Sequence, residues 1–342
     1  MSTSQITAYA AIAAQAAKRV EDGPGGTQQL RVGHPLTYTW NYFSEREDLR
    51  ILYEKSKELM WNGQTRIAWN TPVDPEAENA PDQLNPLFST PIWNRLDPKR
   101  DIPRLRREMA SYTVSNFLHG EQGALLATAQ ILEAAPTADA KLYAAAQVFD
   151  EARHVEVYDR YLREKMEIVY PINVHLKTLL DTILTDSRWD FKFLGMQIMV
   201  EGLALGAFGV IHQTSNEPLI KQITEMIMQD ESRHVAFGVL SLSDTYRTMP
   251  AAELRDREDF VIESSRMLRD RFLWQEVWER VGLPRKECEA AVDQSQYMSM
   301  FRKLLFSKIV PNVKRLGLLT PYVRTAFQEL DVLDFEHAEA EA

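Results

Sequence analysis

The sequence has 342 residues, of which 45% are hydrophobic and 26% charged, and its formal net charge is −10. This length and composition are those of an ordinary globular protein with one large domain or two. The acidic balance lacks the basic field expected of a nucleic-acid binder. The single cysteine, Cys288, excludes an intrachain disulfide and any cysteine-rich metal site.

The cellular location is predicted from the absence of a membrane-spanning run and of a signal-peptide pattern in the sequence. It has no uncharged run of eighteen or more apolar residues, so no membrane span is expected. The alanine-rich stretch 8–17 has no basic segment followed by a long apolar core, so no signal peptide is expected. Together with the low cysteine content, these features predict a cytoplasmic protein.

The first hundred residues are predicted to lie outside the main fold. Residues 1–35 form an N-terminal arm with a clear break at the Gly-Pro-Gly-Gly sequence 23–26. Residues 36–100 are expected to contain one helix, over about 44–67, with Ser44 as its N-cap. The proline-rich remainder of that range predicts a loop that wraps the surface.

Residues 101–247 carry the strongest helical patterns in the chain. A prolyl break or a short polar join separates each pattern from the next, and strand-like alternation is missing. Long helices with short joins predict an all-α four-helix bundle. The four long helices are expected at about 102–134, 138–166, 189–214 and 218–247, and a shorter one at 173–186.

The last third of the chain is predicted to cover the bundle. Residues 248–330 are interpreted as flanking helices, expected at about 251–281, 285–305 and 319–330. Residues 331–342 are acidic and small, which predicts a frayed tail.

One five-residue pattern occurs twice within the expected bundle, as DEARH at 150–154 and DESRH at 230–234. A glutamate and a histidine three residues apart project from one face of a helix, so each pattern offers one oxygen and one nitrogen ligand. A lone glutamate, Glu121 or Glu201, stands 30 residues before the glutamate of each pattern. Composition alone does not generate this matched spacing.

Folded against each other, the two halves would supply four carboxylates and two imidazoles, the ligand set of a carboxylate-bridged di-metal centre. One metal ion would be held by Glu121, Glu151 and His154. The other would be held by Glu201, Glu231 and His234, and one glutamate of each pattern would bridge the two. Oxygen ligands with imidazole suit iron or manganese. We therefore expect two iron ions, or manganese with iron, and dioxygen as a co-substrate.

The residues beside the ligands predict a supporting layer. Asp150 and Asp230 can each reach the distal nitrogen of the histidine on the neighbouring helix and fix its orientation. Arg153 and Arg233 could then pair with the aspartate of the opposite half. The alternative is a set of ordinary surface salt bridges, which the duplication in register makes less attractive.

These motifs resemble the ferritin-like, carboxylate-bridged di-iron oxygenases and oxidases over roughly residues 100–247. Both boxes are especially similar to the hydroxylase subunits of bacterial multicomponent monooxygenases and to soluble acyl-carrier-protein desaturases. The resemblance implies a ferritin-like bundle that activates dioxygen with two electrons from a reductase or ferredoxin. It also implies hydroxylation, N-oxygenation or desaturation of a small, mainly apolar or aromatic substrate, and a homodimer is expected.

Four positions bear on the comparison with particular relatives. The monooxygenase hydroxylases usually carry a hydroxyl residue where this chain has Leu205, and di-iron arylamine N-oxygenases carry a third histidine where it has Ile227. Tyr158 stands where ribonucleotide reductase small subunits place a radical tyrosine, although those proteins normally begin their ligand set with aspartate rather than Glu121. Tyr158 is therefore a candidate for a redox or hydrogen-bonding role.

Two alternatives to an oxygenase stay open at this point. One is a radical-generating or two-electron oxidase of the ribonucleotide-reductase small-subunit type, and the other is a ferritin-like iron oxidation or storage protein. Tryptophans such as Trp61 could line an electron route, but packing explains them more simply. A mainly apolar pocket is expected beside the metals, lined by Phe117, Leu125, Gln147, Gln197, Leu205, Phe208 and Phe237.

Overall fold

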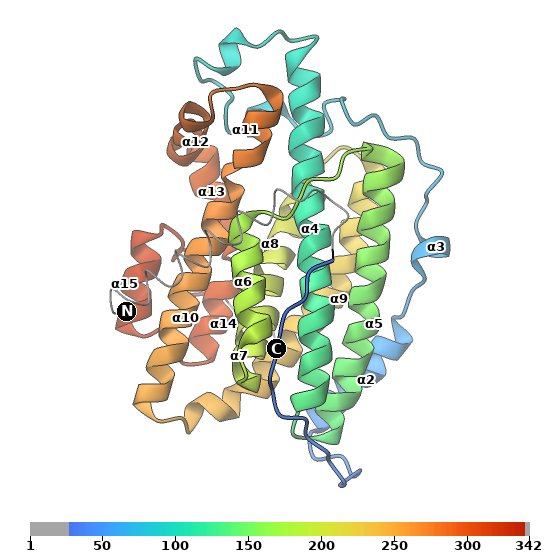
Figure 1. The fold of residues 1–342 in the computed structure, drawn as a ribbon, viewed down its shortest axis with the longest axis vertical. Helices are drawn as coiled ribbons and strands as arrows, with labels where there is room; N and C mark the ends of the chain where they lie inside the picture. Colours follow the sequence, from blue (N-terminus) through green and yellow to red (C-terminus); the bar gives the residue numbers. More distant parts are fainter. Residues whose placement is uncertain (1–26, 339–342) are drawn as a thin grey trace.

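The structure, a computed structural model, describes residues 27–338, and every regular element in that range is a helix (Figure 1). The all-α prediction is therefore confirmed, whereas most of the predicted N-terminal arm lies outside the described residues. A bundle of long helices forms the centre of the fold. Its members are α4 (Asp101–Ala134), α5 (Ala138–Tyr161), the composite helix α7–α8 and α9 (Pro218–Arg247).

The composite third helix differs from its prediction as one uninterrupted α-helix. It consists of α7 (Trp189–Phe193), a π-helical segment (Leu194–Val200) and α8 (Glu201–Thr214). Helix α5 likewise continues into a π-helical segment, Leu162–Met166. Such wide turns are rare in mid-helix and occur frequently at functional sites. The sequence does not reveal the first one. Nearly all seven residues of Leu194–Val200 are apolar and all are buried, so no alternation of polar and apolar residues marks the wide turn.

The stretch Trp189–Thr214 is also long and apolar enough to cross a membrane, with a mean hydropathy of 1.7. However, 78% of its most apolar window is buried inside the protein. This burial is typical of the core helix of a bundle. The hydropathy is therefore explained by the packing of the helix against its neighbours.

The helix predicted over 44–67 is shorter than expected. Helix α2 covers Glu47–Glu58, and α3 (Gly63–Arg66) is a separate single turn. Ser44 is not the N-cap, because that position falls on Arg46. Instead, the carboxylate of Asp139 on α5 accepts the backbone N–H groups of Glu45 and Arg46, at 2.9 and 3.0 Å. A contact with a distant helix thus takes the place of a local cap.

The flanking C-terminal helices are more broken than predicted. Trp274 has a left-handed backbone conformation (φ 49°), which ends one helix and starts another, and Ser295 separates a second pair. The helix at 309–315 was not predicted. The observed elements are α10 (Ala251–Asp270), α11 (Gln275–Val281), α12 (Arg285–Gln294), α13 (Gln296–Leu305), α14 (Ile309–Arg315) and α15 (Pro321–Glu329).

The prediction of a frayed tail is wrong for the part of it that the structure describes, residues 331–338. Val332 is fully buried, and Glu336 forms an ion pair with Arg324. The backbone oxygen of Glu336 also accepts a hydrogen bond from Lys314, at 2.7 Å. The apolar side chain of Val332 holds an otherwise acidic segment against the flanking helices.

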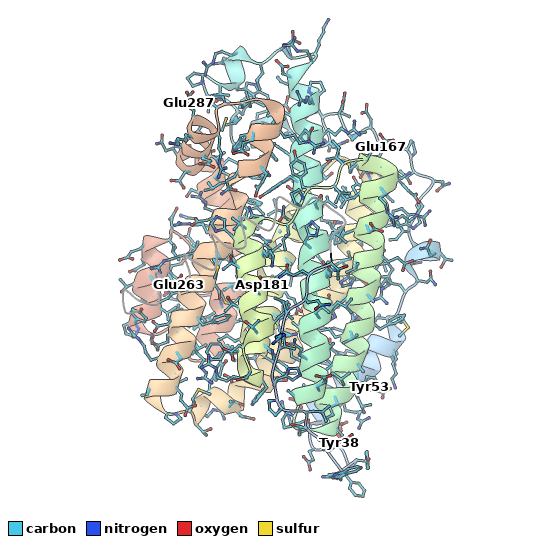
Figure 2. All side chains as sticks on the ribbon, viewed as in Figure 1. Tyr38, Tyr53, Glu167, Asp181, Glu263 and Glu287 are labelled. Carbon is cyan, nitrogen blue, oxygen red and sulfur yellow. The ribbon has the colours of Figure 1, made fainter. Side chains whose placement is uncertain are left out.

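Two segments mark the ends of the bundle. The proline-rich loop after α3 contains only short 3-10 turns (Asp82–Leu84 and Trp93–Arg95), and it covers the end at which α4 begins (Figure 1). At the end of the bundle opposite this loop, near the join of α4 and α5, lies Tyr38 (Figure 2). Next to Tyr38, Thr39 donates a hydrogen bond to the backbone oxygen of Pro136 in the join of α4 and α5. Between the two ends, helix α6 (Val174–Thr185) packs alongside α4.

Helix α13 crosses α8 at a point where the two backbones nearly touch. A Cβ atom at Gly206 would lie 2.8 Å from the backbone oxygen of Leu305 and 3.0 Å from that of Leu304. Backbone atoms cannot move aside as a flexible side chain can. A glycine at this position therefore fixes how closely the flanking helices approach the bundle.

We predict that Gly206→Ala destabilises the protein by about 1–3 kcal/mol, because the added methyl group overpacks a backbone contact. Gly209→Ala on the same helix is the control, since its Cβ would meet only the Met228 sulfur at 4.0 Å. There the gain in helix propensity, about 1 kcal/mol, should dominate. Thermal and urea unfolding measure both variants, and equal stabilities would contradict the prediction.

Candidate metal centre

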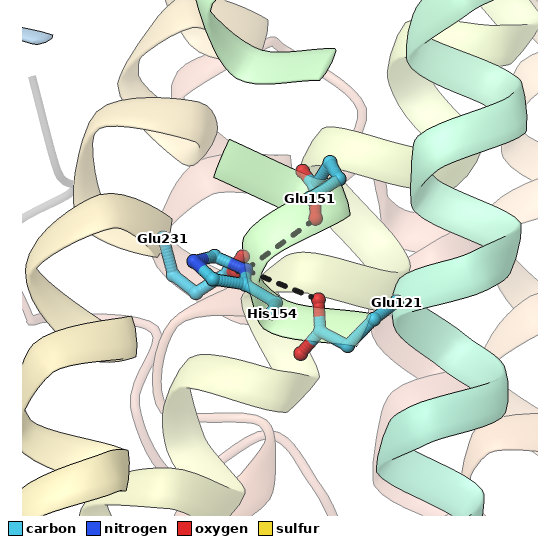
Figure 3. A group of neighbouring side chains, drawn as sticks. All are labelled: Glu121, Glu151, His154 and Glu231. Atoms are coloured by element: carbon cyan, nitrogen blue, oxygen red, sulfur yellow. Dashed lines mark hydrogen bonds and ion pairs between the residues drawn. The ribbon is translucent and has the colours of Figure 1, made fainter. Parts of the chain in front are cut away.

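The six side chains predicted as metal ligands meet in the middle of the bundle. Each of the four long helices contributes, and none of the six residues is more than 6% exposed. Two overlapping groups have potential ligand atoms within 4.8 Å of one another. The first group is Glu121, Glu151, His154 and Glu231, and Figure 3 shows these four side chains facing one another. The second group is Glu151, Glu201 and His234.

The Nδ1 atom of each histidine faces the carboxylates. His154 Nδ1 lies 3.3 Å from Glu121 Oε2 and 3.2 Å from Glu231 Oε1. His234 Nδ1 lies 3.2 Å from Glu151 Oε1. The sequence could not say which ring nitrogen would face inward, because that depends on the rotation of the imidazole.

The two motif glutamates are shared between the halves. Glu151 belongs to both groups and lies near both histidines, at 3.6 Å from His154 and 3.2 Å from His234. Glu231 has the mirror arrangement, at 3.2 Å from His154 and 3.6 Å from His234. Glu121, Glu201 and Glu231 each belong to one group only, but Glu231 alone of these three lies near both histidines. This is the geometry in which Glu151 and Glu231 could bridge two ions.

The outer nitrogen of each histidine faces an aspartate from the opposite helix. Asp230 Oδ2 lies 3.1 Å from His154 Nε2, and Asp150 Oδ2 lies 3.3 Å from His234 Nε2. Arg153 donates to Asp230 at 2.8 Å and to Asp150 at 2.6 Å. Arg233 pairs with Asp230 on its own helix and lies 3.7 Å from Asp150 of the opposite half. Two aspartates and two buried arginines therefore form an outer layer with no net charge, which orients both imidazoles.

Trp61 completes this layer, a role that no sequence pattern indicated. Its indole Nε1 donates to Asp230 Oδ2 at 2.8 Å, and the Arg153 guanidinium lies 4.5 Å from the ring centroid. The indole also stacks on His154, with ring centroids 6.5 Å apart. Because Trp61 lies in the short connection between α2 and α3, no helical periodicity links it to the motifs.

Burial and like charge compete with the histidines in setting the protonation of the centre. Burial, together with the nearby Glu231 carboxylate, raises the pKa of Glu121 to about 8. Burial and the Glu151 carboxylate raise the pKa of Glu201 well above its usual value. Although burial favours a neutral imidazole, hydrogen bonds to Asp230 and Glu121 hold the pKa of His154 well above its usual value. Without metal, the cluster therefore has too little positive charge nearby to keep all four carboxylates ionised.

The donor atoms fit a pair of divalent cations. Buried carboxylate oxygens of Glu151, Glu201 and Glu231 have no hydrogen-bond partner among the described residues, nor does His234 Nδ1. Such atoms are costly unless something compensates them. The four carboxylates carry four negative charges, which two divalent ions would balance. Oxygen and imidazole donors suit iron or manganese, whereas thiolate-rich sites suit zinc or copper(I).

A layer of aromatic rings lies beside the carboxylates, on the side of the bundle where α4 begins. Phe117 lies one turn before Glu121, and its ring centroid is 4.8 Å from that of Phe208 and 5.8 Å from that of Tyr158. The Tyr158 hydroxyl has no hydrogen-bond partner among the described residues. Burial and the Glu121 carboxylate raise the pKa of Tyr158 well above its usual value.

Among the seven predicted pocket residues, Phe117 is the one that lines the apolar cavity beside these rings. Gln147 instead donates its amide to Glu151 at 3.0 Å and Glu201 at 2.9 Å. Gln197 is buried in the π-helical segment, and both of its amide atoms lack a partner among the described residues. The remaining side chains pack in the bundle or on its side: Leu125 is half-buried, and Leu205, Phe208 and Phe237 are buried.

Comparison with known families identifies the chain. The family model for p-aminobenzoate N-oxygenase AurF matches residues 44–317, a range that contains all six converging side chains. The chain belongs to the AurF family. It is therefore a di-iron oxidoreductase of the oxygenase and oxidase class that acts on a small molecule. Membership of the AurF family does not favour a radical-generating subunit or an iron-storage protein.

The fold is that of another ferritin-like group as well. The chain is similar to an R2-like ligand-binding oxidase with an aerobically reconstituted metal cofactor after photoconversion, at 17% identity and a TM-score of 0.52, over 79% of this chain and 93% of that one. A point mutant of an R2-like ligand-binding oxidase, with an anaerobically reconstituted Mn/Fe cofactor, matches at 17% identity and a TM-score of 0.47 over 81% and 94%. The search of curated proteins found no match.

We predict that Asp230→Asn lowers the affinity for the bound metal about 10- to 100-fold, because His154 loses the carboxylate that orients it. Competition with a chromophoric chelator measures this change. Asp159→Asn is the control, since Asp159 on the neighbouring helix α5 pairs with the exposed Arg163 instead of a histidine. Unchanged affinity in Asp230→Asn would show that the aspartate does not support the histidine.

Proposed function

We propose that this member of the AurF family holds two iron ions in the six-residue cluster and oxygenates a small aromatic substrate, with N-oxygenation of an arylamine as the leading reaction. The convergence of four carboxylates and two imidazoles within the segment that matches the family supports the assignment. Glu121 and His154 would hold one ion, Glu201 and His234 the other, and Glu151 and Glu231 would bridge. Manganese with iron is the alternative pair.

The reaction needs an external source of electrons. One oxygen atom of dioxygen goes to the amine nitrogen and the other leaves as water, with two electrons and two protons taken up. When bound, the metals supply the binding and reduction of dioxygen. We propose that a reductase or ferredoxin delivers the electrons to a cytoplasmic homodimer.

The chain's own residues have separate roles in this proposal. The aspartates hold the imidazoles in position, and the Gln147 amide fixes Glu201 relative to Glu151. The aromatic layer of Phe117, Tyr158 and Phe208 keeps water from the carboxylates. Leu205 offers no hydroxyl for proton transfer, so the protons must come from another group.

One feature separates this chain from the arylamine N-oxygenases that its motifs resemble. Ile227 is fully buried one turn before Glu231, at the position where those proteins carry a third histidine. The cluster here therefore has two imidazoles. We propose that N-oxygenation proceeds with this smaller ligand set, and hydroxylation of a ring carbon is the outcome that the same assay would distinguish.

The test is a single turnover of the reduced, iron-loaded protein with ¹⁸O₂ and 4-aminobenzoate. We expect one labelled oxygen atom in the organic product, and mass spectrometry of the product gives the position. Glu121→Ala should abolish the incorporation, because it removes a ligand. Glu225→Ala, at an exposed position on α9, should retain it. Label found only in water would refute the oxygenase proposal.

A further inference from the structure

A cavity of about 250 Å³ lies at the end of the bundle where α4 begins, beneath the proline-rich loop. The loop segment from Pro75 to Pro86 forms one wall. The bundle helices α4, α8 and α9 form the opposite wall, and Trp274 closes the side. The cavity thus lies between the surface loop and helices that carry the metal centre.

The inner wall of this cavity is one helical turn from the carboxylate cluster. Phe117 lines the cavity and precedes Glu121 by four residues on α4, so the two side chains lie on the same face of that helix. Ala207 lines it from α8, and its neighbour Phe208 contacts the Phe117 ring. The aromatic layer therefore lies between the cavity and Glu121.

The polarity of the cavity changes from its mouth to its inner end. At the mouth, Arg106 donates to Asp82 at 2.6 Å, and Asn79 and Asn85 lie nearby. The inner end is formed by apolar side chains such as Val114 and Phe117, both buried. A molecule with an apolar ring and one polar substituent would match this gradient, with the ring directed inward.

We infer that this cavity is the substrate-binding site, that it selects compact single-ring aromatic molecules, and that Phe117 is the gate between it and the metal centre. The inference rests on the proposed function and names the site and substrate class for it. An engineered cavity of about 150 Å³ holds benzene. The space here therefore suits one ring with one or two small substituents.

The first experiment measures binding without turnover. Protein loaded with redox-inert zinc is titrated with 4-fluoroaniline and followed by ¹⁹F NMR. Ala110 lines the cavity from an exposed position on α4, so Ala110→Phe can fill the space without disturbing the core. We expect this variant to weaken binding about tenfold or more, since the added ring occupies space that the ligand needs. Ala145→Phe, at an exposed position on α5, is the matched control.

The second experiment tests the gate. In protein loaded with paramagnetic Mn(II), the relaxation of the bound ¹⁹F nucleus falls with the sixth power of its distance from the metal. Phe117→Leu should increase this relaxation, because a smaller side chain lets the ring approach Glu121. Phe237→Leu also replaces a buried phenylalanine with a smaller side chain, but Phe237 does not line the cavity. In this variant the relaxation of the bound ¹⁹F nucleus should therefore match that in the parent protein.

The outcomes separate this inference from the proposed function. Weaker binding in Ala110→Phe with normal binding in Ala145→Phe supports the cavity assignment, even if no oxygenated product forms. Equal binding in both variants, or no binding to the parent protein, overturns it, even if ¹⁸O enters a product. Equal relaxation in the Phe117 and Phe237 variants overturns the role of Phe117 as the gate.

Discussion

The structure depends on four carboxylates buried together in the middle of a helical bundle. Burial and mutual repulsion make ionised Glu121 and Glu201 unfavourable, as their raised pKa values show. Without metal, the two imidazoles supply part of the missing positive charge. A pair of divalent ions would balance all four carboxylates and would bind the imidazoles in their neutral form. Such a cluster reduces the stability of a protein that does not bind metal. Its presence at the crossing of four helices is therefore best explained by function.

The layer around the cluster shows how the fold supports this arrangement. Asp150 and Asp230 are each shared by a histidine and by buried arginines, so the orienting groups are neutral as a set. Trp61 adds a donor from a segment outside the bundle. The connection between α2 and α3 is consequently part of the centre, although it lies far from the motifs in sequence. A substitution in this connection would change how the centre holds metal without replacing a ligand.

The two sides of the centre differ in polarity along the bundle axis. Toward the start of α4 the neighbouring side chains are aromatic or aliphatic, and beyond them lies the cavity under the loop. Toward the other end lie the amides of Gln147 and Gln197, one turn before Glu151 and Glu201, and beyond them the packed rings of Tyr143, Phe193 and Phe237. The cavity on the first side would let that face admit substrate, while the Gln147 amide on the other holds the carboxylates in place.

The sequence by itself determined the helical class, the approximate positions of the bundle helices and the six converging side chains. It could do so because a helix converts a three-residue spacing into a shared face, and because the duplicated pattern specifies two such faces. Only the tertiary structure decided the inward ring nitrogens, the contact of Trp61 with Asp230, the π-helical turn before Glu201, and Phe117 rather than Phe237 at the cavity. These features depend on side-chain rotation and on contacts between distant segments, which no local periodicity encodes.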